Sequence, residues 1–556
     1  MLLAILAVVA NAQPAPGKAR GRDHAGIGDR WQKRHQVGAR SHRSAGNDRP
    51  APAGRQWTPP PSEGAVGPLP EGSRPPSHAR LPSHGLYVDR SSLGGACSDR
   101  RPAAEVGVAA PWCSLERAAA AAPPGTIVHV RAGVYPQLRL NGARRPDYVT
   151  LRAMPGEQVT VDGFDIDDSS HWRFEGFRIT DLTHMEPNEG PLEPGTVLDH
   201  IQFVGNELTG FGQVVASGQD LLFEDNYVHD VEMTLVPNGE GNCHRDPRGS
   251  SGRAPRCGHG FRIGDASRVV MRGNRLIRIP ADGIQLNGVH DSVFERNSFE
   301  EITPFIDPHE HNDGIQLVGD NDRNVIRANV FVQGANHGII AQPLASGAHP
   351  GAPDDLLIEN NLFVGRFGMN VYNASGVRVI NNTAWNTSIS LRLAQIPGPG
   401  TMTGAVVKNN VLQQFEAPAG MLAEEDHNLI AVGDRRGPHD ISTPPSFVDA
   451  AARDYRLRAG SAGIDAGTSH GTPTSDHHGT SRFDDPAKAN TGGGGARFYD
   501  LGAFEYQPPV ARSTARRSAR NAARRRARRR ARQRQRTART RSSSPPQRRR
   551  GRAARS

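Results

Sequence analysis

The sequence predicts an all-β fold in which short parallel strands stack into a solenoid, and two repeated patterns predict it. Eight segments align on a shared asparagine that follows alternating apolar residues, and five segments share a glycine that precedes an apolar-polar-apolar triplet. Such alternation is typical of strands with one buried face. The 62 Gly and 43 Pro residues, with only 36% hydrophobic residues, suit many tight turns better than helices.

The asparagine series sets the repeat length. Its spacings are 20, 48, 23, 32, 32, 21 and 28 residues, so the basic unit is about 22 residues and the longer intervals carry inserted loops. One such unit cannot bury its apolar face alone, so successive units must stack. We expect the asparagines to occupy left-handed turns and their amides to bond from coil to coil. The series is Asn206, Asn226, Asn274, Asn297, Asn329, Asn361, Asn382 and Asn410.

The glycine series gives the second strand of each unit. It reads "HGFRI", "DGIQL" twice, "HGIIA" and "FGMNV", with Gly260, Gly283, Gly314, Gly338 and Gly368. No unit has a helix long enough for a βαβ crossover, and the leucine spacing of leucine-rich repeats is missing. The predicted fold is therefore a single-stranded right-handed parallel β-helix.

Composition divides the rest of the chain. Residues 13–84 are rich in Pro, Arg, Gly and Ser without a hydrophobic period, so we expect them to be disordered. The β-helix should span residues 85–430, from "GLYVD" onward, and a closing segment should span residues 431–508. The Arg-rich stretch 509–556 has low complexity, and we expect a disordered tail there.

A short helix should precede the first coil. In "CSLERAAAAAPPG" (113–125), Ser114 is a typical N-cap and Pro-Pro-Gly ends the helix. We expect this helix to cover the amino-terminal end of the coils, and "GTIVHVRAGVY" (125–135) to follow as a strand. At the other end, the stretch 474–485, a Gly-containing loop with scattered acids, should cover the open end of the last coil.

The first twelve residues, "MLLAILAVVANA", are apolar and end in a small-x-small triplet. This pattern is typical of the end of a secretory signal peptide, so we interpret residues 1–12 as a signal-peptide remnant. No later stretch approaches eighteen apolar residues, and we expect no membrane span. The protein should therefore be secreted or held in the cell envelope.

The formal charge of +10 reflects the two ends of the chain. Residues 511–556 hold 20 Arg and no acid, and residues 1–84 hold 12 basic and 5 acidic residues. The middle therefore holds 35 basic and 52 acidic residues, a net charge of −17. An acidic working surface favours a neutral or weakly charged glycan, or a cation-assisted site. We expect a monomer that binds nucleic acid only non-specifically, through the tail.

Four cysteines fall into two local pairs. Cys97 and Cys113 lie 16 residues apart, and Cys243 and Cys257 lie 14 apart. In an exported protein, two local disulfides are expected. The alternative for the second pair is a Cys/His metal site with His244 and His259, although the spacing lacks a Cys-x-x-Cys motif.

Candidate functional residues follow from the glycine series. Each apolar pair should point into the coil, so the residue between them points out. Because stacked coils lie about 4.8 Å apart, these outward residues form a column of Arg262, Gln285, Gln316, Ile340 and Asn370. Three residues earlier, a second column reads His259, Asp282, Asp313 and His337. Carboxylates beside histidines on one face can share a proton or bind a cation.

An inserted loop, "TPFIDPHEH" (303–311), precedes Asp313 and should overhang the same face. It adds Asp307, His309, Glu310 and His311. We therefore assign catalysis to Asp313, His309, Asp282, Asp307 and His337, and substrate binding to Gln285, Gln316, Arg262 and His311. Asp282 and Asp313 are also the candidate Ca²⁺ ligands. The alternative is that these groups only hold a wide turn and that the glutamines form a self-satisfied ladder.

The repeats resemble the pectin-lyase-like superfamily of right-handed parallel β-helices. "YRLRAGSAGIDAG" (455–467) and "YDLGAFEYQ" (499–507) resemble the closing segment of many exported bacterial members, and "PGTIVHVRAGVY" (124–135) resembles their opening strand. The resemblance covers roughly residues 85–508. It implies the fold but not one activity, because the family includes lyases, hydrolases, epimerases and non-catalytic surface proteins.

The candidate residues match three catalytic patterns of that family only in part. The order Asp282, Asp313, His337 is similar to polygalacturonase-type hydrolases, but their paired aspartates and later Arg-x-Lys are missing. The "DPH" at 307–309 has the letters of an alginate epimerase motif but precedes the strand. Pectate-lyase-type elimination needs a basic residue and usually Ca²⁺, and Arg262 is the nearby candidate.

The resemblance therefore implies an exported carbohydrate-active protein, a lyase, hydrolase or epimerase that acts on a polysaccharide in a groove along the parallel sheet. No cofactor is certain, and Ca²⁺ is the candidate. The alternative from another class is a non-catalytic envelope β-helix that binds glycan or serves as a scaffold.

Overall fold

A computed structural model describes residues 85–185, 196–210, 212–232, 258–302, 312–332, 336–347, 349–418, 420–433 and 437–508. The predictions for residues 1–84 and 509–556 lie outside these ranges. So do those for Cys243, Cys257 and the loop 303–311.

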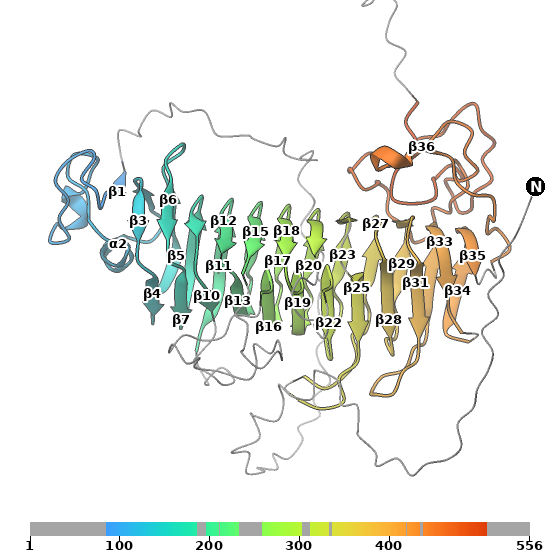
Figure 1. Ribbon diagram of the computed structural model, residues 1–556, viewed down its shortest axis with the longest axis horizontal. Coiled ribbons are helices and arrows are strands. Elements are labelled where there is room, and N and C mark those ends of the chain that lie inside the picture. The colour runs from blue at the N-terminus through green and yellow to red at the C-terminus, as the bar shows by residue number, and fades with distance from the viewer. Residues whose placement is uncertain are drawn as a thin grey trace, which may run out of the picture. The chain divides into compact units, whose positions relative to one another are not determined.

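Three parallel ladders make up the body of the described chain (Figure 1), and their strands join into one hydrogen-bonded set of 35 strands. Each coil contributes one strand to each ladder, in the same order, and each strand pairs with its equivalent one coil away. The prediction of a right-handed parallel β-helix is confirmed. We name the three ladders A, B and C.

Ladder A contains the glycine series that the sequence predicts. Its strands are β4 (Leu138–Asn141), β7 (Phe164–Asp167), β10 (Thr183–Met185), β13 (Val214–Gln219), β16 (Phe261–Ser267), β19 (Ile284–His290), β22 (Ile315–Val318), β25 (His337–Gln342), β28 (Phe367–Tyr372) and β31 (Ile389–Ala394).

Ladder B follows ladder A in each coil and ends at the asparagine turn. Its strands are β1 (Leu86–Val88), β2 (Ile127–Val130), β5 (Arg144–Ala153), β8 (Ser169–Glu175), β11 (Leu198–Val204), β14 (Leu222–Glu224), β17 (Val270–Arg272), β20 (Val293–Glu295), β23 (Val325–Arg327), β26 (Leu357–Glu359), β29 (Arg378–Ile380), β32 (Ala405–Lys408) and β34 (Leu422–Asp426).

Ladder C completes each coil. Its strands are β3 (Gly133–Tyr135), β6 (Val159–Val161), β9 (Arg178–Ile179), β12 (Glu207–Gly210), β15 (Tyr227–Val231), β18 (Arg275–Ile279), β21 (Ser298–Ile302), β24 (Val330–Val332), β27 (Leu362–Val364), β30 (Thr383–Ala384), β33 (Val411–Glu416) and β35 (Leu429–Gly433). The described coils thus run from Ile127 to Gly433, close to the predicted span.

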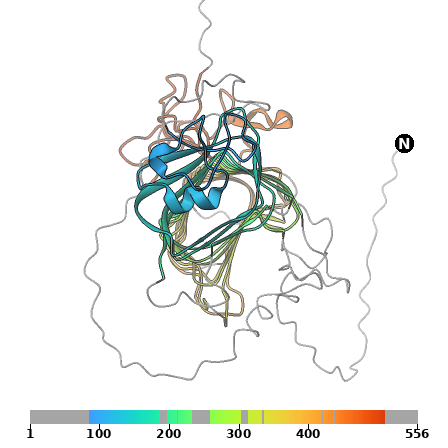
Figure 2. The same cartoon turned by 90° about the vertical axis from the view of Figure 1, so that its left-hand side faces the viewer.

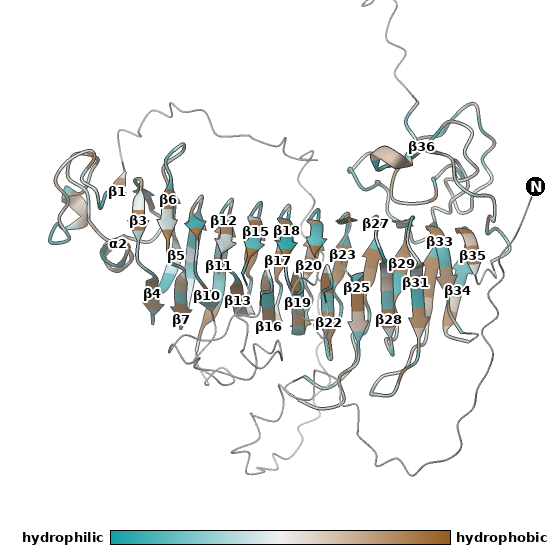
Figure 3. Ribbon diagram, in the orientation of Figure 1, coloured by the Kyte–Doolittle hydropathy of each residue, from teal (hydrophilic) through white to brown (hydrophobic). Residues whose placement is uncertain are grey.

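Side chains at equivalent positions stack inside the coils. The rings of Phe299, Phe331 and Phe363 on ladder C lie parallel, with centroids 4.7 and 4.8 Å apart. The glycine column makes room for this stack, because a Cβ on Gly283 would meet Phe299 at 2.8 Å and the next glycine's carbonyl at 2.7 Å. Hydrophobic and hydrophilic segments are mixed along the strands in Figure 3, as expected when alternate residues enter the core.

The asparagine series forms a hydrogen-bonded ladder at the turn from ladder B to ladder C. Asn329 is representative: its Oδ1 accepts from the N and Nδ2 of Asn297 at 2.9 and 3.0 Å, and its Nδ2 donates to Phe294 O at 2.8 Å and to Asn361 Oδ1 at 3.0 Å. The predicted coil-to-coil amide ladder is confirmed, and Asn428 extends it beyond the predicted series.

The left-handed turn residue, however, is the one before each ladder asparagine. Asp225, Arg296, Ala328, Asn360 and Asn381 all have φ between 53° and 56°, whereas the ladder asparagines are absent from the left-handed residues. The prediction that the ladder asparagines themselves are left-handed is wrong. The preceding residue reverses the chain, and this leaves the next side chain directed inward, where its amide is buried.

The short helix α2 (Leu115–Ala121) covers the amino-terminal end of the coils, as Figure 2 shows. Ser114 Oγ accepts from Arg117 N at 3.1 Å, so the predicted N-cap is confirmed. Leu115, Ala118 and Ala119 are buried in the same core cluster as the first strands. The short 3₁₀ helix η1 (Ala103–Glu105) precedes it.

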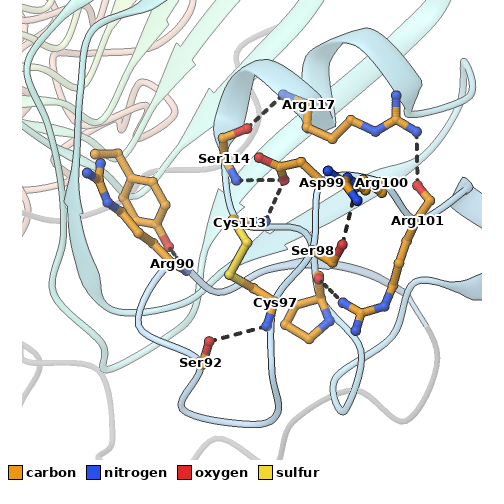
Figure 4. The surroundings of a disulfide bond; sticks show 12 residues. Arg90, Ser92, Cys97, Ser98, Asp99, Arg100, Arg101, Cys113, Ser114 and Arg117 are labelled. Carbon is orange, nitrogen blue, oxygen red and sulfur yellow. Dashed lines mark hydrogen bonds between the residues drawn. A yellow bond between two sulfur atoms is a disulfide. The ribbon is translucent and has the colours of Figure 1, made fainter.

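A disulfide joins Cys97 to Cys113 beside this helix (Figure 4), with the two Cα atoms 5.0 Å apart. The prediction for this pair is confirmed. Asp99 lies beside the bond, and its Oδ1 accepts from Cys113 N at 2.7 Å and from Ser114 N at 3.2 Å. The disulfide and Asp99 together hold the loop against the start of α2.

In the closing segment, residues 437–508, Ile441 pairs in parallel with Leu429 of the last coil, and much of the remainder lies along the side of ladder C. The segment holds β36 (Phe447–Asp449), η2 (Ala450–Ala452) and β37 (Asp454–Leu457). Its Ser475 O accepts from Asn360 Nδ2 at 3.0 Å, and its Ala503 N donates to Thr383 Oγ1 at 2.9 Å. The expectation that residues 474–485 cover the coil end is therefore wrong.

The reason is the outward face of ladder C, which is apolar in these coils. Val332, Leu362 and Val364 point out of the coil and pack in one cluster with Tyr455 and Phe504 of the closing segment. Exposed apolar residues in successive coils require a cover.

Among the described residues, no helix is long and apolar enough to cross a membrane.

Replacing Asn329 by alanine should lower the thermal unfolding midpoint. The buried N–H groups of Asn297 would lose their acceptor, and this should cost roughly 2–4 kcal/mol. Asn141→Ala, at an exposed position at the end of β4, is the matched control. Circular dichroism measures both midpoints, and equal midpoints would contradict a stabilising ladder.

Gly283→Ala should also destabilise the coils, by about 1–3 kcal/mol, because its Cβ would overlap the phenylalanine stack. Gly264→Ala serves as control in the same ladder, since a Cβ there would meet only Asn287 O, at 3.4 Å. Urea denaturation of the two variants measures the difference. Equal stability of the Gly283→Ala and Gly264→Ala proteins would show that the phenylalanine rings move aside at little cost in stability.

Candidate functional site

Long inserted segments precede or follow several strands of ladder A. The turns from ladder B to ladder C stay short, whereas the long inserts all fall at one edge or the other of ladder A. Inserts 233–257 and 303–311 precede β16 and β22, and inserts 186–195, 343–356 and 395–404 follow β10, β25 and β31. Of these inserts, the structure describes 395–404 fully and 343–356 except for residue 348. Long connections of this kind often carry binding residues in proteins.

The predicted outward column lies on this face. Arg262 pairs in register with Gln285, Gln285 with Gln316, Gln316 with Ile340, and Ile340 with Asn370. Gln285 Nε2 donates to Gln316 Oε1 at 2.8 Å. The column is therefore confirmed as a geometric arrangement, with the two glutamines bonded to each other.

The column continues in both directions beyond the predicted residues. Asn370 pairs with Arg392, whose Nε donates to Glu416 at 2.8 Å. On the amino-terminal side, the register runs from Arg262 through Val215 and His184 to Asp165. The strands β10, β13 and β31 lack the glycine that anchors the alignment, whereas β7 follows Gly163 in "DGFDI" (162–166), a copy of the pattern that the sequence analysis overlooked.

The centre of the column points away from the core but is scarcely exposed. Gln316 is 6% exposed, Ile340 4% and Asn370 3%, while Arg262 and Gln285 are half-buried. The prediction that Gln316 points out of the coil is confirmed by its neighbours Ile315 and Leu317, which are fully buried in the core. Arg262 and Gln285 are thus the more accessible of the proposed substrate contacts.

The second predicted column is a continuous hydrogen-bonded run across four coils. Asp282 N donates to His259 Nδ1 at 3.2 Å, and Asp313 N donates to Asp282 Oδ1 at 2.9 Å. Asp313 Oδ1 accepts from His337 N at 3.0 Å and lies 2.9 Å from His337 Nδ1. We call His259, Asp282, Asp313 and His337 the acid–histidine run.

His337 uses both ring nitrogens. With a carboxylate oxygen next to Nδ1, the proton belongs on Nδ1, and Nε2 then accepts from Asn370 Nδ2 at 2.9 Å. The His337 ring also stacks on Phe367, with centroids 5.1 Å apart. Asn370 Nδ2 lies 3.1 Å from the hydroxyl of Tyr372, a partner that the sequence analysis missed although it occupies the next outward position.

The run is deeply buried. Asp313 is 0% exposed, Asp282 1%, His259 4% and His337 7%. Asp313 precedes β22 by two residues, where its carboxylate satisfies the backbone N–H of the next coil. These groups thus hold successive coils together, whether or not they also act in catalysis. Holding the backbone in this way is the alternative role that the sequence analysis left open.

Three of the predicted site residues, Asp307, His309 and His311, belong to insert 303–311 and lie outside the described residues. Their roles stay predictions. Asn312, which directly follows that insert, is described: it is 1% exposed, and its Nδ2 donates to Pro280 O at 2.6 Å. This bond fixes the end of the insert against the coil that carries Asp282.

The outward charges of ladder B are paired with each other, as are those at the amino-terminal end of ladder A, where Arg139 and His184 flank Asp165. Arg272 lies 2.6 Å from Glu224, and Arg327 lies 2.7 Å from Glu295. Coil-to-coil pairs of this kind neutralise the face they cover. Ladder B therefore offers a ligand little unpaired charge, whereas the centre of the ladder A column is formed by amide side chains.

The described residues do not supply a Ca²⁺ ligand set at Asp282 and Asp313. Ca²⁺ takes 6–8 oxygen ligands, whereas Oδ1 of each carboxylate already accepts a backbone N–H, and the described residues place no third acid or histidine with them in a metal-binding group. We therefore route no chemical step through Ca²⁺.

Comparison with known proteins agrees with this fold. Residues 157–384 match the family model described as the right handed beta helix region. The match spans less than half of the chain, and the fold of the described residues is a right-handed parallel β-helix. No curated protein sequence matches it.

Several solved structures are similar to this chain. The pectate lyase Pel9A is 16% identical, with a TM-score of 0.41, over 76% of this chain and 96% of its own. A mutant of the PL6 family alginate lyase AlyGC is 14% identical, with a TM-score of 0.43, over 62% of this chain and 56% of its own. The catalytic unit of a GH87 alpha-1,3-glucanase from Streptomyces thermodiastaticus is 18% identical, with a TM-score of 0.41, over 65% of this chain and 66% of its own.

Asp313→Ala should destabilise this β-helix by roughly 2–4 kcal/mol, because the buried N–H and Nδ1–H of His337 would lose their acceptor. Asp313→Asn keeps one acceptor oxygen and should cost only about 1 kcal/mol. Thermal unfolding of the two variants measures the difference. If both unfold at the parent's midpoint, the acid–histidine run contributes nothing to coil stacking.

Proposed function

We propose that this β-helix binds a polysaccharide along ladder A and acts on it as a lyase, hydrolase or epimerase. The observation that supports this most is the acid–histidine run, which places two carboxylates and two imidazoles on four successive coils of one ladder. Inserted segments precede or follow that ladder in several coils. The same arrangement occurs on neither of the other two ladders of the described coils.

In the proposed reaction, Asp313 and His337 form the proton-transfer pair. Asp313 holds the Nδ1–H of His337 and stabilises the charge that the imidazole gains when it takes up a proton. Nε2 would have to exchange its contact with Asn370 for the substrate. Asp282, one coil earlier, is the second acid/base group, and His309 and Asp307 of the insert are proposed to complete the site.

Arg262 and Gln285 are the proposed substrate contacts next to this pair. Both point out from ladder A and are half-buried, so one side of each remains open to a ligand. Hydrogen bonds from an amide and a guanidinium suit sugar hydroxyls and, for Arg262, one carboxylate. The net charge of −17 over residues 85–510 favours a neutral or weakly charged polymer over a dense polyanion.

A location outside the cytoplasm accords with such a substrate. The Cys97–Cys113 disulfide supports this location, because disulfides persist in oxidising compartments. We propose that the protein is secreted or held at the cell envelope, as the apolar start of the chain also indicates.

The alternative is a β-helix that binds glycan without turning it over. Burial of the acid–histidine run favours this alternative, because Asp282 and Asp313 are at most 1% exposed and both hold backbone N–H groups. Under this proposal, the columns of ladder A are structural, and the half-buried residues alone contact the polymer.

A panel of polysaccharides incubated with the full chain, with and without Ca²⁺, decides between the two proposals. Unsaturated ends report a lyase, new reducing ends a hydrolase, and changed sugar stereochemistry by NMR an epimerase. We expect turnover of at least one glycan and its loss, by at least about 100-fold, in Asp313→Asn. A variant that keeps full turnover while folded would place the site elsewhere.

Binding is tested with two arginines of one coil. Arg262→Ala on ladder A should weaken retention on the immobilised glycan, whereas Arg275→Ala, outward on ladder C, should not. Retention that depends on Arg262 without any turnover would support the non-catalytic alternative. Equal retention by both variants would contradict ladder A as the binding face.

A further inference from the structure

A column of left-handed residues lies at the corner between ladders A and B, outside the proposed polysaccharide site. Its members have φ between 52° and 62° and occupy equivalent positions in successive coils: His171, His200, Asp220, Arg268, Asp291, Arg323 and Asp355. From Asp220 onward, acids and arginines alternate. Arg268 lies 2.7 Å from Asp220, and Arg323 lies 2.7 Å from Asp291.

The alternation breaks at the amino-terminal end of this corner column. His171 and His200 are stacked with ring centroids 4.4 Å apart and planes 6° from parallel. Asp199 precedes His200 on β11, and its Oδ1 lies 3.3 Å from His200 Nδ1. Coil stacking thus brings together two imidazoles and a carboxylate from two strands that are 29 residues apart in sequence.

All three inward atoms are buried and unsatisfied. One ligand atom from each of His171, Asp199 and His200 lies within 4.8 Å of the other two. The buried atoms of these side chains are His171 Nδ1, His200 Nδ1 and Asp199 Oδ1. None of the three has a hydrogen-bond partner among the described residues, and each is sealed from solvent. Buried polar atoms without partners are rare, so three in one group require an explanation.

The two other metal-ligating groups among the described residues differ in this respect. In one, His290 Nδ1 already accepts from Asp322 N at 3.2 Å. In the other, Asp426 Oδ2 already lies 2.8 Å from His439 Nδ1, in hydrogen-bond geometry. In the group at His171, one buried ligand atom of each of the three side chains lacks a hydrogen bond among the described residues.

We propose that His171, Asp199 and His200 bind a divalent transition metal ion of the Zn²⁺ type. Two imidazole nitrogens and one carboxylate oxygen form a common Zn²⁺ ligand set, whereas Ca²⁺ and Mg²⁺ prefer oxygen ligands alone. Two ligands at about 2.0–2.1 Å from a tetrahedral ion lie roughly 3.4 Å apart, close to the 3.3 Å between Asp199 Oδ1 and His200 Nδ1.

The fourth coordination position faces the surface. The side chains of His200 and Asp199 are 40% and 34% exposed, although their ligand atoms are sealed. A water molecule or a ligand atom can therefore approach from the solvent side. Tyr148 packs edge-on against the His171 ring, with centroids 5.4 Å apart, and fixes the direction of that ligand. This site does not depend on the proposed polysaccharide activity.

Zn²⁺ titration of the full chain, purified without a histidine tag and stripped with a chelator, tests the proposal. Competition with a chromophoric zinc chelator measures affinity, and elemental mass spectrometry measures stoichiometry. The test variants are Asp199→Asn and His200→Asn, because asparagine tolerates the left-handed backbone at residue 200. Each should weaken binding by more than the roughly 10–100-fold that loss of an outer-shell partner costs.

His427→Asn is the matched control. His427 is also left-handed, with φ of 54°, and also lies beside an aspartate and a second histidine. We expect it to bind Zn²⁺ as the parent does. Unfolding midpoints measured without metal should be similar for His200→Asn and the parent, which separates loss of the ion from loss of the fold.

Co²⁺ gives an independent readout, since a four-coordinate ion has a characteristic visible spectrum that should vanish in Asp199→Asn. The proposal is overturned if the parent binds no Zn²⁺, if the Asp199 and His200 variants bind it as tightly as the parent, or if His427→Asn loses affinity to the same extent.

Discussion

The hydrogen bonds between each coil and the next are the constraint on which the rest of this structure depends. Every strand of the three ladders pairs in parallel with its equivalent one coil away, so a residue meets the same position of the neighbouring unit. Side chains therefore interact as columns. The amide ladder around Asn329, the phenylalanine stack and the ion pairs of ladder B are consequences of this single register.

The chemistry of each column decides what its face does. Alternating acids and arginines neutralise ladder B, and apolar residues on ladder C bind the closing segment through Phe504 and Tyr455. On ladder A, the outward column carries amides, and the acid–histidine run lies three residues earlier in each coil. One backbone geometry thus produces a charged face, a covered face and a candidate functional face.

Burial is what separates a structural column from a reactive one. Asp313 holds a backbone N–H and an imidazole of the next coil, so its carboxylate contributes to stacking and orients His337 at once. A group that does both must stay in place, and this favours catalysis only if a ligand reaches His337. The corner column contrasts with this run, because its histidine nitrogens are buried without such partners.

The sequence by itself determined the repeat, the strand register and both columns of ladder A, because period-2 alternation and a fixed coil length leave one alignment of "DGIQL" on its second copy. It also placed the N-cap at Ser114 and the Cys97–Cys113 pair, which depend on local contacts. It missed the left-handed residue by one position, since the turn is set by the backbone and not by the asparagine that follows.

Only the tertiary structure decided which face of the coils the closing segment covers and which outward side chains are buried. The closing segment lies along ladder C because the apolar residues Val332 and Leu362 face outward there, which requires the register of three coils to be known. Gln316 is outward yet buried for a similar reason. The meeting of His171 with His200 depends on stacking of β8 on β11, and the left-handed backbone at both residues interrupts the alternation from which a sequence pattern would be read.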